Sequence, residues 1–233
     1  MKTIGILGGM SHESTGHYYR LINQGVRTRL GGLHSARIVL LSVDFATIEP
    51  LQAADEWDAA GALLAADARR IERAGADFLL LATNTMHRCA DAIAEAIDIP
   101  LLHLADATAG AIEDGGVERV ALLGTRYTME QPFYRERLER RGLRVDVPPA
   151  ADRTELNRII FEELCQGVIR PDSRVTLQRM IRDLGSVGAT AVIAGCTEIT
   201  MLIDAADSPL PLFDTTAIHA EAAVTRALDT TTA

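Results

Sequence analysis

Short apolar runs alternate along the chain with longer stretches in which apolar positions recur with a helical period. The apolar runs predict strands at 3–7, 36–42, 78–82, 99–102, 117–123 and 191–194. The amphipathic stretches predict helices at 14–30, 55–74, 88–96, 106–113, 129–141, 153–166, 173–184 and 217–228. Alternation of this kind is typical of βα units around a parallel sheet, so the pattern predicts an α/β fold.

Local signals mark some of the expected helix ends. Asp55 is suited to cap the start of the 55–74 helix, and Gly142 to end the 129–141 helix. Pro171 and Asp172 indicate a break before the helix that starts at Ser173.

The two halves of the sequence resemble each other. One segment begins at Gly75, continues as an apolar run and reaches Thr83. A second segment has the same pattern from Gly188 to Cys196, and in both the final residue comes eight positions after the glycine. The opening run 4–8 likewise matches 120–124, and Tyr19-Arg20 matches Tyr134-Arg135. The offsets lie between 113 and 116 residues, close to half of the chain, which indicates two domains of similar fold.

We therefore expect two pseudo-symmetric α/β domains with parallel sheets. One comprises residues 1–103 with the C-terminal segment 212–233, and the other comprises residues 104–211. Ligands of open α/β sheets lie beyond the carboxyl ends of the strands. Thr83 and Cys196, at the ends of equivalent strands, are then expected to approach one bound molecule from opposite sides in an interdomain active site.

Charge and composition exclude several classes of partner. A formal charge of −9 argues against nucleic acid and anionic membrane surfaces, and no apolar stretch is long enough to span a membrane. The opening residues do not have the pattern of a signal peptide, and three scattered cysteines form neither a disulfide framework nor a metal motif. We expect a cytoplasmic protein that binds no metal.

Lysine occurs once, as Lys2 at the start of the first predicted strand. Amino-acid racemases that use pyridoxal phosphate need a Schiff-base lysine inside the site. The position of Lys2 argues against that cofactor.

Cofactor-free removal of an α-hydrogen needs a base on one face of the carbon and an acid on the other. Cys196 is a candidate base because it lies where an apolar strand ends, and a helix N-terminus there would lower its pKa from about 8.5 toward neutrality. The alternative interpretation is a buried structural cysteine.

The segments 8–11, 84–87 and 195–198 (Gly-Gly-Met-Ser, Asn-Thr-Met-His and Gly-Cys-Thr-Glu) resemble the aspartate/glutamate racemase family over essentially the whole chain. The resemblance implies two Rossmann-like domains, no cofactor, a homodimer and an acidic amino acid as the small-molecule substrate. Cell-wall glutamate racemases usually have His after Cys-Thr, so Glu198 favours the aspartate/glutamate branch.

The sequence departs from this family at one catalytic position. Most members have a second catalytic cysteine before Asn-Thr, where this chain has Thr83. A hydroxyl is a much weaker acid than a thiol, so we expect an asymmetric racemase in which Cys196 takes the proton and Thr83 returns it. Three alternatives remain open. The protein is a one-base isomerase or decarboxylase of a small carboxylic acid that uses Cys196 alone, or it is a non-catalytic amino-acid binding protein. The third alternative is that the Thr83 hydroxyl only bonds to the backbone or to a substrate carboxylate.

Four strand-to-helix corners offer hydroxyl, amide and backbone N–H groups for the substrate carboxylates. Together with Gln52 in a possible lid turn, the candidate binding residues are Met10, Ser11, Gln52, Asn84, Thr85, Thr125, Tyr127, Thr128, Thr197 and Glu198. The resemblance implies that Asn84, Thr85 and Thr197 contact the α-carboxylate and ammonium groups. Arg126 either pairs with a side-chain carboxylate or lies on the surface.

Several residues near these corners have more than one interpretation. Glu198 orients Cys196, binds the substrate ammonium group, or caps its helix. His219 either supports the second base or is a core histidine, and His87 is expected to brace its loop. Cys89 and Cys165 lie on amphipathic stretches and are expected to be core residues.

Overall fold

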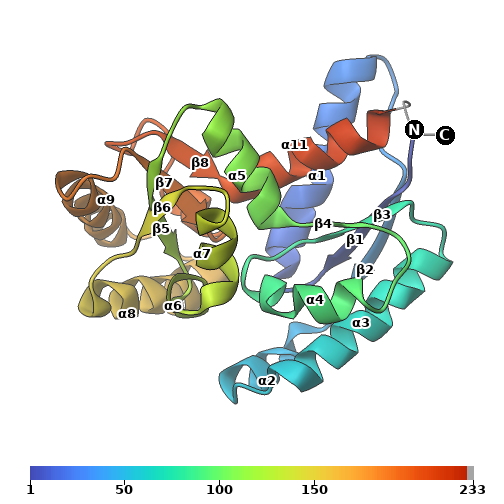
Figure 1. The fold of residues 1–233 in the computed structure, drawn as a ribbon, viewed down its shortest axis with the longest axis horizontal. Helices are drawn as coiled ribbons and strands as arrows, with labels where there is room; N and C mark the ends of the chain where they lie inside the picture. The colour runs from blue at the N-terminus through green and yellow to red at the C-terminus, as the bar shows by residue number, and fades with distance from the viewer. Residues whose placement is uncertain (230–233) are drawn as a thin grey trace. The chain divides into compact units, whose positions relative to one another are not determined.

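The structure is a computed structural model that describes residues 1–229. It divides into unit 1, which comprises residues 1–104 and the C-terminal segment from His219, and unit 2, which comprises residues 105–218. Each unit contains one four-stranded parallel sheet with helices on its faces (Figure 1). The predicted α/β fold with two parallel sheets is confirmed.

The sheet of unit 1 has the strand order β2-β1-β3-β4. Its strands are β1 (Ile4–Gly8), β2 (Ile38–Ser42), β3 (Phe78–Leu81) and β4 (Leu101–Leu102). Its helices are α1 (His12–Leu30), α2 (Glu49–Ala53), α3 (Trp57–Arg73), α4 (Ala90–Ala94), the first residue of α5 (Leu104–Asp114) and most of α11 (Thr215–Leu228).

Helices α1 and α11 pack against the same apolar face of this sheet (Figure 1). Tyr18, Ile22 and Val26 recur along one side of α1 and are fully buried with Ile4 and Ile6 of β1. Helix α3 packs closely at Gly5, where an added Cβ would lie 2.5 Å from a methyl carbon of Ile71. Burial on both faces explains why the central strands are uniformly apolar.

The sheet of unit 2 repeats this order as β6-β5-β7-β8. Its strands are β5 (Arg119–Gly124), β6 (Arg144–Asp146), β7 (Ala191–Gly195) and β8 (Leu212–Asp214). Its helices are α6 (Arg126–Glu130), α7 (Pro132–Glu139), α8 (Ala150–Arg158), α9 (Pro171–Ser186), α10 (Ile199–Leu202), most of α5 and the first turn of α11. The core of unit 2 gathers residues of β5, β7, α8 and α9.

The internal repeat is visible in the strand register. Ile4 pairs with Phe78 in unit 1, and the equivalent residues Val120 and Ala191 pair in unit 2. Counting five residues from each third-strand partner leads to Thr83 and to Cys196. The two residues therefore occupy equivalent places, Thr83 two positions beyond the end of β3 and Cys196 one position beyond the end of β7.

The division between the units differs from the predicted one at the C-terminal side. The sequence placed 212–233 with the first domain, but β8 pairs in register with β7, so residues 212–218 belong to unit 2. The chain returns to unit 1 inside α11, at His219. Residues 230–233 of that prediction lie outside the described part of the chain.

Several local elements differ from the predictions. Asp55 does not cap α3: it has a positive φ of 61°, accepts a hydrogen bond from the Trp57 indole, and leaves Glu56 at the cap position. Pro171 is the first residue of α9 rather than a break before it, as its fixed φ allows. The predicted 129–141 helix is two helices, because Gln131 before Pro132 is extended.

The predicted 153–166 helix is also interrupted. Helix α8 continues into a π-helical segment, Ile159–Glu163, and a 3-10 turn, Leu164–Gln166. The Glu163 carboxylate in that segment is buried and accepts hydrogen bonds from Ser173 and Arg158. Among residues 1–229, no helix has both the length and the apolar character needed to cross a bilayer.

Candidate active site

The corners that follow the first and third strands lie next to each other in each unit, because those strands are hydrogen-bonded neighbours. In unit 1, β1 and β3 pair through Leu7 and Leu81, and the Ala82 amide extends the pairing to the Leu7 carbonyl. The Ser14 hydroxyl of α1 donates to the Ala82 carbonyl at 3.3 Å. In unit 2, Gly124 and Gly195 pair at the ends of β5 and β7.

Unit 1 holds half of the predicted site residues, and these side chains are mostly buried. Ser11 caps α1 by accepting the Ser14 amide, while Asn84 and Thr85 open the 3-10 turn Thr85–Cys89 that follows Thr83. Met10, Thr83, Asn84 and Thr85 are all less than a tenth exposed.

Gln52 does not lie in a lid turn. It is on the short helix α2, where its backbone groups continue the helical hydrogen bonding, and its side chain is 3% exposed. Pro50 lies in the first turn of this helix, where proline is tolerated.

Unit 2 holds the other half of the predicted residues. Thr125 caps α6 by accepting the Thr128 amide, and its hydroxyl lies 3.2 Å from that of Thr128. Thr197 receives a hydrogen bond at 3.1 Å from the hydroxyl of Thr216. Arg126 is exposed, with its guanidinium 5.9 Å from the centre of the half-buried Tyr127 ring, so the surface interpretation describes it.

Cys196 and Glu198 form a buried hydrogen-bonded pair. The Cys196 Sγ donates to Glu198 Oε2 at 2.9 Å, and both residues are less than a tenth exposed. Glu198 lies at the cap position of α10 but makes no side-chain capping hydrogen bond there. Of the three interpretations of Glu198, the structure supports the one in which it orients Cys196.

The environment of Cys196 favours the thiol over the thiolate. Burial and the adjacent Glu198 carboxylate raise the pKa of Cys196 well above its ordinary value. The expectation that a helix N-terminus lowers this pKa is wrong, since α10 comprises only the four residues Ile199–Leu202 and its field is outweighed. A thiolate at this position therefore needs a neighbouring group that accepts the thiol proton.

The other cysteines are core residues, as predicted. Cys89 is buried in unit 1, and its thiol donates weakly to the Trp57 carbonyl at 3.6 Å. Cys165 packs against the core of unit 2. Burial raises their pKa values to about 11 and about 12, so both are poor nucleophiles.

His219 and His87 lie in the core of unit 1. His219 is fully buried within α11, bonded to the Tyr18 hydroxyl at 3.0 Å and to the Leu102 carbonyl at 2.8 Å. Burial lowers the pKa of His219 to about 4, so of the two alternatives His219 is a core histidine. His87 braces its loop, as expected, through the Thr83 carbonyl.

Two threonines near Cys196 were not predicted as part of this region. The Thr215 hydroxyl donates to the Ala194 carbonyl at 2.8 Å, and Thr216 reaches Thr197. Both begin the helix after β8, a three-residue strand that the sequence pattern did not predict. The sequence did contain a signal for this region, the two threonines that follow Asp214. The Asp214 carboxylate accepts hydrogen bonds from two backbone N–H groups at the start of α11.

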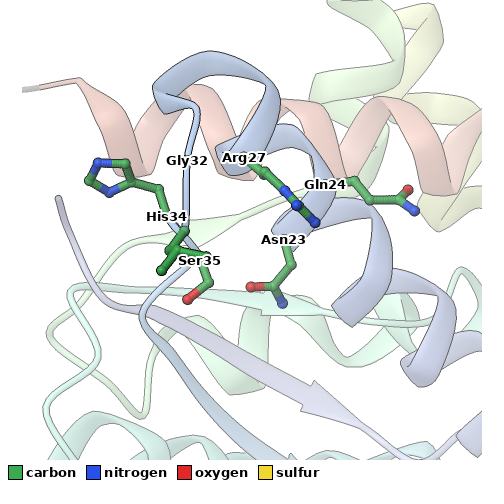
Figure 2. A pocket seen from close by; sticks show the side chains of 7 residues that line it. Asn23, Gln24, Arg27, Gly32, His34 and Ser35 are labelled. Atoms are coloured by element: carbon green, nitrogen blue, oxygen red, sulfur yellow. The ribbon is translucent and has the colours of Figure 1, made fainter.

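The surface pocket in Figure 2 does not include these corners. It has a volume of about 280 Å³ and is formed by the second half of α1 and the loop that follows it. Its lining residues are Asn23, Gln24, Arg27, Gly32, Leu33, His34 and Ser35. None of the candidate catalytic or binding residues is among them.

The geometry described above agrees with a known family of enzymes. The model of the family described as Asp/Glu/hydantoin racemase matches residues 7–223, which include all four corners. The chain belongs to the Asp/Glu/hydantoin racemase family. It is an amino-acid racemase, and the resemblance inferred from the short motifs is confirmed.

Solved structures and a characterised relative resemble this racemase over much of its length. A proposed Asp/Glu racemase from Yersinia pestis is 53% identical, with a TM-score of 0.93 and coverage of 98% of this chain and 100% of that one. An aspartate racemase homologue from Pyrococcus horikoshii OT3 is 34% identical, with a TM-score of 0.86 and coverage of 98% and 100%. The broad-specificity amino-acid racemase RacX of Bacillus subtilis (strain 168) is 25% identical over 155 residues, 66% of each chain.

Proposed function

We propose that this racemase interconverts the enantiomers of an acidic amino acid, aspartate or glutamate, without a cofactor. Cys196 takes the α-hydrogen on one face of the carbon, and Thr83 returns a proton to the other. The observation that carries the proposal is the buried hydrogen bond from Cys196 to Glu198, at a place equivalent to that of Thr83. The proposal includes a homodimer, as the family resemblance implies, and a cytoplasmic location, as the opening residues and the scattered cysteines indicate.

The Cys196–Glu198 pair supplies the base. The proton moves from Sγ to Glu198 Oε2, and the thiolate then removes the α-hydrogen, so that the S–H bond forms again as the C–H bond breaks. Glu198 afterwards releases its proton to solvent. This order of events lets a thiol with a raised pKa act as a base at neutral pH.

Thr83 supplies the acid. Its hydroxyl gives a proton to the carbanion, and the alkoxide that forms takes a proton back from solvent. The equilibrium constant between enantiomers is one, so kcat/KM must be equal in both directions. The difference in acidity between the hydroxyl and the thiol therefore appears in the separate kcat and KM values of the two directions, while kcat/KM is equal in both.

Buried hydroxyl and amide groups at the corners support binding of carboxylates. Ser11, Asn84 and Thr85 lie beside the Thr83 corner, whereas Thr125, Thr128 and Thr197 lie beside the Cys196 corner. Such neutral donors bind carboxylates without bringing a buried cation into the site. The choice of an acidic side chain is supported by the aspartate racemase homologue among the similar structures.

Hydrogen–deuterium exchange in D₂O tests the function. We expect the protein to racemise aspartate or glutamate and to place deuterium at the α-carbon of the product, measured by NMR and chiral chromatography. Alanine and lysine serve as non-acidic comparison substrates. Faster racemisation of these two would show the substrate class to be wrong, exchange without racemisation would favour one-base chemistry, and absence of any exchange would favour a binding protein.

The Glu198→Gln variant tests the proton acceptor. Glutamine cannot accept the thiol proton, so we expect exchange and racemisation near pH 7 to fall by roughly a hundredfold or more. The remaining activity should rise about tenfold per pH unit, because the thiolate then forms only by loss of a proton to solvent. The Glu198→Asp variant, which keeps the carboxylate, should lose less and keep the pH profile of the unmodified enzyme.

Steady-state rates measured between about pH 6 and pH 10 distinguish this role from a purely structural one. If Glu198→Gln had the pH profile of the unmodified enzyme, Glu198 would not be the acceptor of the Cys196 proton.

A further inference from the structure

A buried histidine holds the backbone of the corner that contains Thr83. His87 is 2% exposed and lies in the 3-10 turn that follows β3. Its Nδ1 is 2.7 Å from the Thr83 carbonyl oxygen, and its Nε2 is 3.2 Å from the backbone nitrogen of Leu104. Both ring nitrogens are therefore engaged with the main chain.

These two contacts determine the state of the ring. A backbone N–H group can only donate, so Nε2 must accept the hydrogen bond from Leu104. The single ring proton then lies on Nδ1, which donates it to the Thr83 carbonyl. A neutral imidazole satisfies both partners at once, because it carries one donor and one acceptor on opposite sides of the ring.

Leu104 has a special place in the chain. It is the first residue of α5 and the last residue of unit 1, so α5 carries the chain into unit 2. Helix α11 carries the chain back, because residues 215–218 belong to unit 2 and the helix continues from His219 in unit 1. Both helices follow the fourth strand of the unit in which they begin.

The start of each of these helices is tied to the corner after the third strand of the same unit. In unit 2, Thr215 binds the Ala194 carbonyl and Thr216 binds the Thr197 hydroxyl, on either side of Cys196 in the sequence. In unit 1, the tie runs from the Leu104 amide through His87 to the Thr83 carbonyl. The same connection is made by two hydroxyl groups in one unit and by an imidazole in the other.

We propose that His87 is a positioning residue for Thr83, which it holds against the start of α5 through a bridge from the Leu104 amide to the Thr83 carbonyl. This inference rests on the proposed role of Thr83 in proton return. A weak acid depends on close alignment with the carbon that receives its proton, because its driving force is small. We therefore expect the bridge to affect the Thr83 half of the reaction and to spare the Cys196 half.

The surroundings of His87 support a bridge rather than a proton carrier. His103 packs against His87 with ring centres 4.5 Å apart, and the ring centre of His219 is 6.0 Å from that of His87. The Nδ1 atom of His219 is hydrogen-bonded to the Tyr18 hydroxyl. Burial keeps His219 neutral at neutral pH. With both nitrogens of His87 bonded to backbone, its position is defined from two directions.

Two substitutions separate the two contacts of the ring. The side-chain amide of His87→Asn lies near the Nδ1 position and keeps a donor for the Thr83 carbonyl. The longer side chain of His87→Gln reaches the Nε2 position and keeps an acceptor for Leu104 but loses the donor to Thr83. The two measurements are racemisation, which needs both residues, and deuterium exchange of the enantiomer whose α-hydrogen faces Cys196.

For His87→Gln we expect racemisation to fall roughly ten- to a hundredfold while exchange at the Cys196 face stays within about twofold. His87→Asn should lose clearly less racemisation. Thr216→Val, the matched variant in unit 2, should instead lower exchange and racemisation together. Circular dichroism and thermal unfolding establish that each variant is folded.

Two results would overturn the inference. Racemisation by folded His87→Gln at the unmodified rate would show that the bridge does not matter. A parallel fall of exchange and racemisation would show that His87 has only a general structural role. Failure of the proposed function is seen separately, because the unmodified protein would then show no racemisation of the acidic substrates.

Discussion

Replacement of Cys196 by alanine is expected to abolish racemisation in both directions and α-hydrogen exchange of the enantiomer whose α-hydrogen faces Cys196, with a loss of at least about a thousandfold. The Cys196 thiolate removes this hydrogen in one direction, and the Cys196 thiol returns a proton to the same face in the other. The Glu198 carboxylate remains in the variant but has no thiol to deprotonate.

The neighbouring thiol provides the matched control for this variant. Cys165 packs against the same core as Cys196, and Cys165→Ala removes a sulfur atom of equal size. We expect Cys165→Ala to keep the unmodified rates within about twofold, because the hydrogen bond to the Glu198 carboxylate comes from the Cys196 thiol. Exchange by Cys196→Ala at a comparable rate would show that the base is another group.

Replacement of Thr83 by alanine has the second largest expected effect. Racemisation should fall at least about a hundredfold, because no group then returns a proton to the second face. Exchange of one enantiomer, the one whose α-hydrogen faces Cys196, should continue within about twofold. The two rates are measured in the same D₂O incubation by chiral separation followed by mass spectrometry.

Two further substitutions at position 83 define the chemistry of the hydroxyl. Thr83→Ser keeps an acid of similar strength and should retain much of the activity. Thr83→Cys introduces a thiol, a far stronger acid, and should raise kcat in at least one direction while kcat/KM stays equal in both. Full racemisation by Thr83→Ala would leave one-base chemistry by Cys196 as the better account.

The central strands of both sheets were predictable because they are buried on both faces. β1, β3 and β7 consist of apolar residues and glycine, as does β5 after Arg119. The repeated spacing from Gly75 to Thr83 and from Gly188 to Cys196 indicated where β3 and β7 end. The edge strands β6 and β8 were missed, since each has three residues that are at least partly exposed. Missing β8 also placed residues 212–218 in the wrong unit.

The places of the candidate site residues at strand ends were predictable, but their electrostatics were not. Glu198 is two positions from Cys196, a spacing that places side chains on one face of a strand but not of a helix, and neither residue lies in a strand. Their contact depends on the irregular corner between β7 and α10. Burial, together with this contact, raises the Cys196 pKa that the sequence argument expected to fall. The bridge from His87 to Leu104 joins residues seventeen positions apart and needed the fold to be seen.

The interleaved order of the two units has a consequence for synthesis on the ribosome. The core of unit 1 includes Ala220, Ala223, Val224 and Ala227 of α11, and the Lys2 amide donates to the Ala227 carbonyl. These partners are translated after all of unit 2. Unit 1, whose synthesis starts before that of unit 2, is therefore completed after it, and the nascent chain must leave part of the apolar face of its first sheet uncovered until α11 has been made.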